Sequence, residues 1–305
     1  MLKIDKSTFE TIERQIYNRA RDIDVALFNS LTDETSKEFV LDCLTMYMNN
    51  DGGFGSGLEI DNYNPNSSVY QTYEALRILD MLGFDSNCEN ELYVELVNKA
   101  GNYLYNRSSL NDNRWNPLVK TNNDHAHSEE YTYYENAINT WNFHPTAALI
   151  GFSLTMYKPA KAYYKKALKL IGFALSYFKE KVTLSNYDFI SFNSLLGSLK
   201  KANLFLEEQN LIEAKLKEQA LAKLDDSSFN IATMLSNCNL DGKLQDALDN
   251  KLDAIINDIK PHGLWEHTKG WGNTKYPEAE SAALKWLGAE SVNNLYILKK
   301  YGRLD

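Results

Sequence analysis

Residues 49–83 read NNDGGFGSGLEIDNYNPNSSVYQTYEALRILDMLG and combine a glycine-rich turn, two acidic residues and the start of an amphipathic helix. Glycine tolerates the left-handed backbone conformations that tight turns require, so the segment around Phe54 is expected to turn sharply. After Ser68 the apolar residues recur at helical spacing, and Gly83 suits the position just beyond a helix end. The stripe consists of Val69, Tyr73, Leu76, Leu79 and Leu82.

The same helical periodicity continues along the chain, and no run alternates as a half-buried strand would. One helix is expected from Pro145 to just before Pro159, and the next buries Ala167, Ile171, Ala174, Leu175 and Phe178. Further helices are predicted to begin near residues 186, 206, 228, 241, 277 and 291. The sequence therefore predicts an all-α protein of about twelve helices.

An imperfect internal repeat suggests how these helices are arranged. Gly53-Phe54 precedes the helix TYEALRILDMLG much as Gly263-Leu264-Trp265 precedes ESAALKWLG. Helical hairpins that repeat in this way bury their apolar faces by stacking on one another. No linker-like segment divides the chain, so we expect a single domain over 1–305, an (α/α)6 toroid of six hairpins closed into a ring. An open solenoid is the alternative.

Composition and net charge limit the kinds of partner that the protein is expected to bind. The 305 residues carry a net charge of −9, which argues against nucleic acid and against an anionic membrane surface. The longest apolar stretch, TAALIGFSLTMY, is too short to span a bilayer. The N-terminal residues lack the apolar core of a signal peptide, and three cysteines fit free thiols better than disulfides. We therefore expect a cytoplasmic protein that acts on a small molecule; the sequence does not indicate its oligomeric state.

Several motifs resemble a known superfamily. The turn NNDGGFG is similar to the repeat turn of squalene cyclases, terpene cyclases and protein prenyltransferase β subunits, which share an (α/α)6 toroid. A bacterial group within this superfamily is more similar still, with a DGGFG turn, an L-E-x-D segment, a later helix start and a C-terminal G-R-L. In this chain these motifs are Asp51–Gly55, Leu58–Asp61, His144–Ala147 and the GRL that ends at Leu304. The resemblance implies the fold.

The chemistry of those relatives is not implied by the residues present. Squalene–hopene-type cyclases protonate their substrates with an Asp-x-Asp-Asp motif, and the sequence contains no such run. Protein prenyltransferases bind zinc through Asp, Cys and His, and none of the cysteines lies in a matching motif. The resemblance therefore leaves the reaction unassigned.

The first candidate site follows the opening turn. Glu59 and Asp61 stand two residues apart, so in an extended loop both carboxylates can point to one side. If both were shielded from water, their repulsion would raise one pKa and give an acid beside a base. A solvated loop near a helix N-terminus is the alternative.

The second candidate site is the segment NNDHAHSEEYTYYENA, which starts at residue 122, with the NTWNFHPTA that follows it. His125 and His127 could ligate a metal with neighbouring acids, but their spacing is not diagnostic, and we assign neither a metal nor a cofactor. Trp141, Asn142 and His144 lead into a helix N-terminus and are candidate substrate-binding residues.

The third candidate site is HGLWEHTKGWGNTKYPEAES, residues 262–281. It offers aromatic stacking surfaces together with an acid and an imidazole. The candidate substrate-binding residues are Trp265, Glu266, Trp271 and Tyr276, and His267 is a candidate catalytic residue. For Trp265 the alternative is a buried plug that is equivalent to Phe54.

If the helices close into a ring, the three segments meet around one mouth. The function predicted from the sequence is general acid–base chemistry on a small organic substrate, with Glu59 and Asp61 as the pair and His125 or His267 as their partner. Two alternatives stay open. One is a carbohydrate-active enzyme with two carboxyl groups flanking a groove. The other is a module that binds a metabolite or peptide without catalysis.

Overall fold

The computed structural model describes residues 1–267, 270–271 and 275–304. Within these ranges the chain forms thirteen α-helices, three 3-10 helices and one hairpin of two-residue strands. The all-α prediction is therefore confirmed. The α-helices are α1 (Lys6–Arg19), α2 (Asp22–Thr32), α3 (Lys37–Thr45), α4 (Val69–Met81), α5 (Glu91–Asn106), α6 (Ala137–Trp141), α7 (Thr146–Met156), α8 (Ala162–Glu180), α9 (Asn186–Ala202), α10 (Leu206–Leu221), α11 (Ile231–Met234), α12 (Gly242–Asn257) and α13 (Glu278–Lys300).

The shorter elements all lie between helices. Strands β1 (Leu110–Asn111) and β2 (Arg114–Trp115) pair antiparallel in the connection that follows α5. The 3-10 helices are η1 (Glu34–Ser36), η2 (Lys120–Asp124) and η3 (Glu129–Tyr131). The last two belong to the long segment between α5 and α6, which contains the second candidate site.

Helix α4 begins and ends where the sequence predicts. The Ser68 hydroxyl accepts the backbone N–H of Gln71 at 3.1 Å, the N-cap contact expected of serine. Gly83 has φ of 82°, so the chain leaves the helix through the left-handed region.

The separate helix predicted to begin near Ser291 is wrong. Helix α13 continues unbroken from Glu278 to Lys300, and Gly288 lies inside it. A Cβ at Gly288 would stand 2.5 Å from the Cβ of Ala20. The glycine thus permits close packing against the end of α1, and does not end a helix as the sequence suggests.

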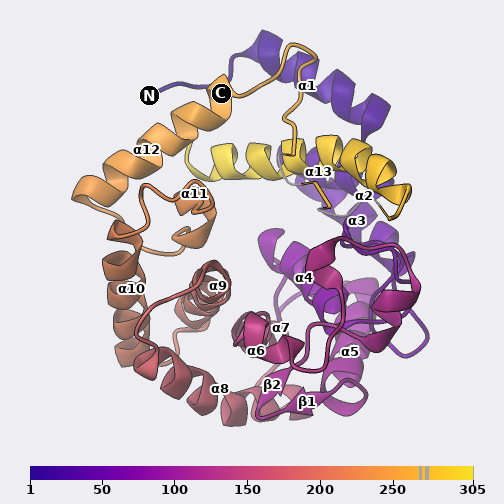
Figure 1. The fold of residues 1–305 in the computed structure, drawn as a ribbon, viewed down its shortest axis with the longest axis vertical. Helices are drawn as coiled ribbons and strands as arrows, with labels where there is room; N and C mark the ends of the chain where they lie inside the picture. The colour runs from indigo at the N-terminus through magenta and orange to yellow at the C-terminus, as the bar shows by residue number, and fades with distance from the viewer. Residues whose placement is uncertain (268–269, 272–274, 305) are drawn as a thin grey trace.

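The helices lie around a ring (Figure 1). Helices α4, α7, α9, α11 and α13 are on its inner side, and α1, α8, α10 and α12 are on its outer side. Because α6 has five residues and α11 only four, the hairpins are uneven. The finer (α/α)6 assignment stays a prediction.

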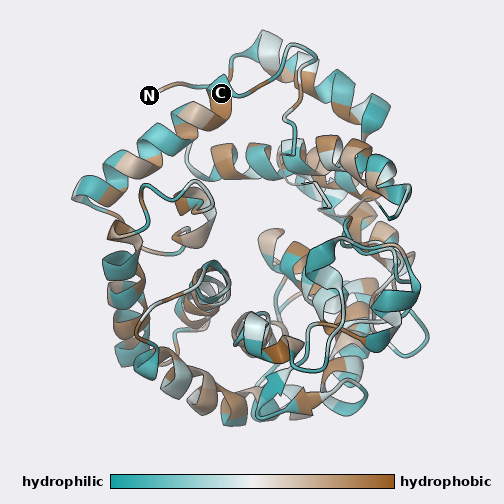
Figure 2. Cartoon of the chain, in the orientation of Figure 1, coloured by the Kyte–Doolittle hydropathy of each residue, from teal (hydrophilic) through white to brown (hydrophobic). Residues whose placement is uncertain are grey.

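Burial follows the position of each helix in the ring. On outer helix α12 the buried residues are Leu244, Leu248, Leu252 and Ile255, one stripe at helical spacing. Hydrophilic and hydrophobic residues alternate along α10 and α12 (Figure 2). Every residue of inner helix α7 is buried. Across the described residues, no helix is long and apolar enough to cross a membrane.

The two ends of the chain meet and close the ring. The Arg303 guanidinium, almost fully buried, donates to Asp249 at 2.7 Å and Asp253 at 2.6 Å, both on α12. It also donates to the carbonyl of Leu2 at 2.9 Å, and Ile4 forms a parallel bridge with Leu304. The arginine of the C-terminal GRL thus joins the first residues, the last residues and α12.

Candidate functional site

The two glycine–aromatic turns of the predicted repeat make the same contact. The backbone N–H of Phe54 donates to the Thr72 hydroxyl at 3.1 Å, and that of Trp265 donates to the Ser291 hydroxyl at 3.1 Å. Both side chains are buried, and the Trp265 indole donates to the carbonyl of Ile255 at 2.6 Å. This placement favours the plug alternative for Trp265, so it does not enter the site proposed below.

A third plug was not recognised in the sequence. The N–H of Trp115 donates to the Thr146 hydroxyl at 2.9 Å, and its indole donates to the carbonyl of Leu104 at 2.7 Å. No glycine precedes it; Asp112 and Asn113 adopt φ of 49° and 60° instead. Asp and Asn tolerate this left-handed region better than most residues. The pair Asp-Asn before an aromatic was the signal that could have revealed it.

Asp61 anchors the first candidate segment to the third. Its Oδ1 accepts the indole N–H of Trp271 at 2.7 Å and that of Trp286 at 2.8 Å. The two indoles come from either side of the start of α13. The structure therefore brings together Asp61 and Trp271, which the sequence analysis placed in separate candidate sites. Trp286 was not singled out.

Glu59 is in a different environment from Asp61. The residue is 8% exposed, and among the described residues its Oε1 accepts only the backbone N–H of Asp61, at 3.3 Å. The pKa of Glu59 is raised well above its ordinary value, first by burial and then by the charges of Glu74 and Asp61. The Asp61 N–H and Arg21 oppose this shift. The surroundings of Glu59 therefore favour its protonated form over its charged form.

Glu74, on α4, is the second carboxyl group of this site. Its Oε2 accepts from Arg77 Nη2 at 2.8 Å and from Arg77 Nε at 2.9 Å, so Glu74 and Arg77 form an ion pair. Glu74 was not recognised from the sequence, because a single polar residue in an amphipathic helix is usually exposed to solvent. Its place between Tyr70 and Arg77, on one side of the helix, was the available signal.

Two tyrosines connect Glu59 with the second candidate segment. Burial raises the pKa of Tyr70 and of Tyr131, and the nearby charge of Glu59 raises both further. The ring centroids of the two tyrosines are 5.3 Å apart, and that of Tyr70 is 5.2 Å from that of Trp141. Tyr70, Tyr131 and Trp141 are thus in contact although they are distant in sequence, and Glu59 acts electrostatically on both tyrosines.

His144 continues this aromatic cluster. Its imidazole stacks on Trp141 and Tyr187, with centroid distances of 5.7 and 5.4 Å. Burial lowers its pKa to about 3, so the imidazole is neutral. Its Nδ1 is buried and has no hydrogen-bond partner in the described part of the chain. Asn142 is half-buried and adopts φ of 54° at the end of α6.

The His125–His127 pair has a structural arrangement. His127 uses Nδ1 to contact the carbonyl of His125 at 2.7 Å and Nε2 to contact the Thr132 hydroxyl at 3.1 Å. Both of its nitrogens are therefore occupied. Across residues 1–267, 270–271 and 275–304, no three His, Cys, Asp or Glu side chains are grouped as a metal ion would require. The structure places only the backbone of His125 in this contact.

Some residues of the third candidate segment lie near the tryptophans that bind Asp61, and others lie at the surface. The His267 ring stacks on Trp286 with ring centroids 4.1 Å apart, and its Nδ1 lies 3.4 Å from the Glu290 carboxylate. Trp286 in turn donates its indole N–H to Asp61. Tyr276 lies edge-on to Trp271, with centroids 6.3 Å apart.

Glu266 takes no part in this arrangement. Its side chain is exposed and faces His262 at 3.3 Å. It therefore stands apart from the carboxyl groups of the first segment.

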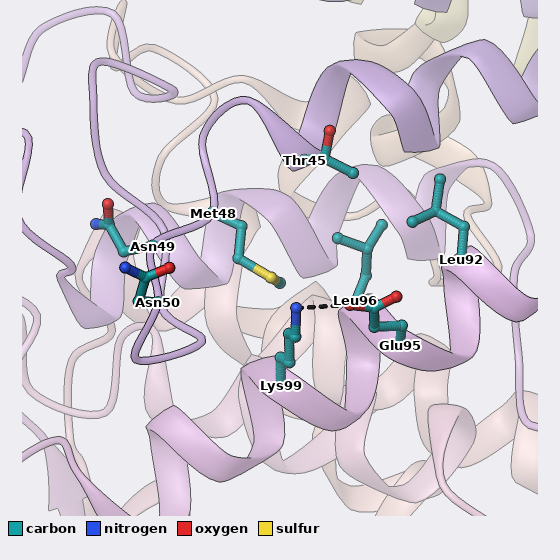
Figure 3. Close-up of a pocket in the computed structure, with 8 residues that line it drawn as sticks. All are labelled: Thr45, Met48, Asn49, Asn50, Leu92, Glu95, Leu96 and Lys99. Carbon is teal, nitrogen blue, oxygen red and sulfur yellow. Dashed lines mark ion pairs between the residues drawn. The ribbon is translucent and has the colours of Figure 1, made fainter.

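Two small hollows lie elsewhere. One, of about 200 Å³, is formed by the end of α3, the turn at Asn49 and Asn50, and α5, where Lys99 pairs with Glu95 (Figure 3). The other, of about 280 Å³, is lined by residues that include Arg21, Cys43 and Lys285. Both are smaller than usual ligand pockets, and neither is lined by Glu59 or Glu74.

Comparisons with known proteins return no match: no family model, no curated protein and no solved structure is similar to this chain. The resemblance described from the sequence motifs therefore stays an expectation.

Proposed function

We propose that the protein is an enzyme that performs general acid–base chemistry on a small organic substrate, with Glu59 as the acid. The observation that carries this proposal is the environment of Glu59. A buried carboxyl group whose pKa is raised, and which has no side-chain hydrogen-bond partner among the described residues, is suited to act as a general acid.

Glu74 is the better candidate for the second group of the pair. Asp61 Oδ1 is occupied by two indole N–H groups, whereas Glu74, which forms an ion pair with Arg77, is the charge that acts most strongly on Glu59. Two carboxyl groups in different surroundings are the usual arrangement of an acid and a base. Asp61 then has a positioning role, because it fixes the loop that contains Glu59.

The aromatic cluster supports a substrate that contains a ring or an apolar surface. Trp141 and His144 adjoin Tyr70, which lies close to Glu59. Trp271, Tyr276 and His267 adjoin the Asp61 anchor on the other side. Terpenoid cyclase-like or prenyltransferase-like chemistry is what the sequence resemblance implies; the chain lacks the Asp-x-Asp-Asp acid, so we propose only the type of catalysis. The three free cysteines support a cytoplasmic location.

Metabolite profiling tests the proposal. The wild-type protein and the Glu59→Gln variant are incubated with a small-molecule extract and analysed by mass spectrometry. We expect the wild-type protein to consume at least one compound and the variant to leave it unchanged. A ligand that binds both proteins without being converted by either would instead identify a binding module.

A further inference from the structure

The inner helix α4 presents a polar stripe. Tyr70, Glu74 and Arg77 are spaced by four and three residues, so they lie along one side of the helix. In Figure 1, α4 is among the helices nearest the centre of the ring. The side chain of Glu74 keeps 12% of its surface exposed and that of Arg77 keeps 36%. Solvent therefore reaches an ion pair on an inner helix.

Arg77 is enclosed although solvent reaches it. Burial by the surrounding protein is the largest single influence on its pKa and acts to lower it, but the charge and hydrogen bond of Glu74, together with Tyr73 and Tyr70, outweigh burial and the net shift is upward. The side-chain exposures agree, since most of the Glu74 carboxylate side chain and about two thirds of the Arg77 side chain are covered by protein. The ion pair is thus partly enclosed and is still reached by solvent.

The ion pair keeps free hydrogen-bonding groups. Arg77 uses Nε and Nη2, both on the same Glu74 oxygen. Among the described residues, neither Arg77 Nη1 nor Glu74 Oε1 has a hydrogen-bond partner. The Arg77 Nη1 donor and the Glu74 Oε1 acceptor are therefore both available on the same ion pair. Vicinal hydroxyl groups, each able to donate and accept, are complementary to such an edge.

An apolar ligand would be a poor match for the same edge. A hydrocarbon placed against it would remove water from two charged groups without replacing the lost hydrogen bonds. The half-buried aromatic faces of Tyr70 and Tyr187 nearby offer apolar contact to the face of a ring. The surroundings thus combine a polar edge with aromatic walls.

We propose that this site binds a polyhydroxylated ring of about monosaccharide size, with its hydroxyl groups on the Glu74–Arg77 edge. The inference rests on the proposed function, in which Glu59 is the acid of the same site. Glu74 and Arg77 are three residues apart, about one helical turn or about 5 Å along α4, which is comparable to the width of a single sugar ring. Of all the charged groups, Glu74 acts most strongly on Glu59, so the same ligand would be exposed to both carboxyl groups.

Ligand-observed NMR with a defined set of probes tests the substrate class. The probes are glucose, galactose, mannose and N-acetylglucosamine, with farnesol as the apolar rival and inorganic phosphate as the anionic one. We expect at least one sugar to bind the wild-type protein, and Arg77→Gln to weaken that binding at least tenfold. Arg77→Lys should also weaken it, because lysine lacks the planar fork. The control is Glu95→Gln, which breaks an exposed ion pair on the outer helix α5 and should leave binding unchanged.

The outcomes separate the substrate class from the catalytic proposal. Circular dichroism of each variant establishes that it is folded, and Arg77→Lys provides a second test if Arg77→Gln is not. Failure of all four sugars to bind, binding of farnesol or phosphate in their place, or unchanged sugar affinity in the folded Arg77 variants would overturn the inference. A sugar that binds in an Arg77-dependent manner but is converted by neither wild type nor Glu59→Gln would uphold the ligand class and overturn the proposed catalysis.

Discussion

The turn at Phe54 and the turn at Trp265 begin alike and end differently. Each places a buried aromatic residue against the hydroxyl group of the inner helix that follows it, at the same 3.1 Å. Beyond the plug, the first turn supplies carboxyl groups, Glu59 and Asp61, whereas the second supplies the indoles of Trp271 and Trp286 that bind one of them. The repeat thus accounts for the contacts that the two turns share. The residues after the two plugs differ, and Asp61 from the first copy accepts hydrogen bonds from the two indoles of the second.

Removing the plugs tests the shared half of this comparison and should have the largest effect. Phe54→Ala and Trp265→Ala each delete a fully buried aromatic ring, which costs about 3–5 kcal/mol of unfolding free energy. Urea unfolding followed by circular dichroism measures both. If the two plugs are equivalent, the losses are similar; a loss below about 1 kcal/mol for either variant would show that its turn is not a structural unit.

Replacing Asp61 tests the contact that joins the two regions. Asp61→Ala leaves two indole N–H groups without their acceptor, and we expect a loss of about 2–4 kcal/mol. Asp61→Asn keeps an amide oxygen and should lose about half as much. Urea unfolding gives the free energies, and tryptophan fluorescence reports the change around the indoles. Equal losses in the two variants would argue against an anchor made by hydrogen bonds.

The raised pKa of Glu59 predicts that the stability of the protein depends on pH. Burial, followed by the charges of Glu74 and Asp61, raises the pKa of Glu59, whereas Arg21 and the Asp61 N–H act in the opposite direction. The folded protein therefore holds a proton that the unfolded chain releases above about pH 4.3. Wild-type stability should match that of Glu59→Gln at low pH and then fall relative to it as pH rises, by at most about 1.4 kcal/mol per pH unit, until the pKa of folded Glu59 is passed.

Urea titrations of wild type and Glu59→Gln at a series of pH values measure this difference. A stability difference between wild type and Glu59→Gln that does not change with pH would mean that Glu59 titrates normally and would remove the basis for its role as the acid.

The smallest effect is expected at the hydroxyl groups that receive the plugs. Thr72→Val and Ser291→Ala remove the acceptors of the Phe54 and Trp265 N–H groups. Each should cost about 1 kcal/mol, the usual contribution of one hydrogen bond. Differential scanning calorimetry can compare the two variants. A cost in one turn and none in the other would break the equivalence of the two copies.

The fold was accessible from the sequence where local rules decide it. The Ser68 cap, the Gly83 exit and the buried stripe of α8 depend on residues within a few positions of one another, and each was predicted correctly. Gly288 was misread as a helix end because its role depends on Ala20, which is distant in sequence. Trp115 was missed because Asp112 and Asn113, and not glycines, adopt the positive φ angles in its turn.

The candidate site was accessible only in part for the same reason. The sequence pattern indicated Glu59 and the segment that contains Trp141, but it could not show that Trp271 and Trp286 donate to Asp61, or that the charge of Glu74 acts on Glu59. These relations join residues from 15 to 225 positions apart. Spacing along the chain carries no information about them, because they exist only after the helices have packed.

The Arg303 contacts make the order in which the chain runs around the molecule largely arbitrary. Since Ile4 already pairs with Leu304, a short peptide could join these neighbouring segments covalently. The polypeptide could then be opened at an exposed connection elsewhere, such as the one between α8 and α9, with every helix keeping its neighbours. Such a rearranged gene would encode the same set of contacts from a different starting point.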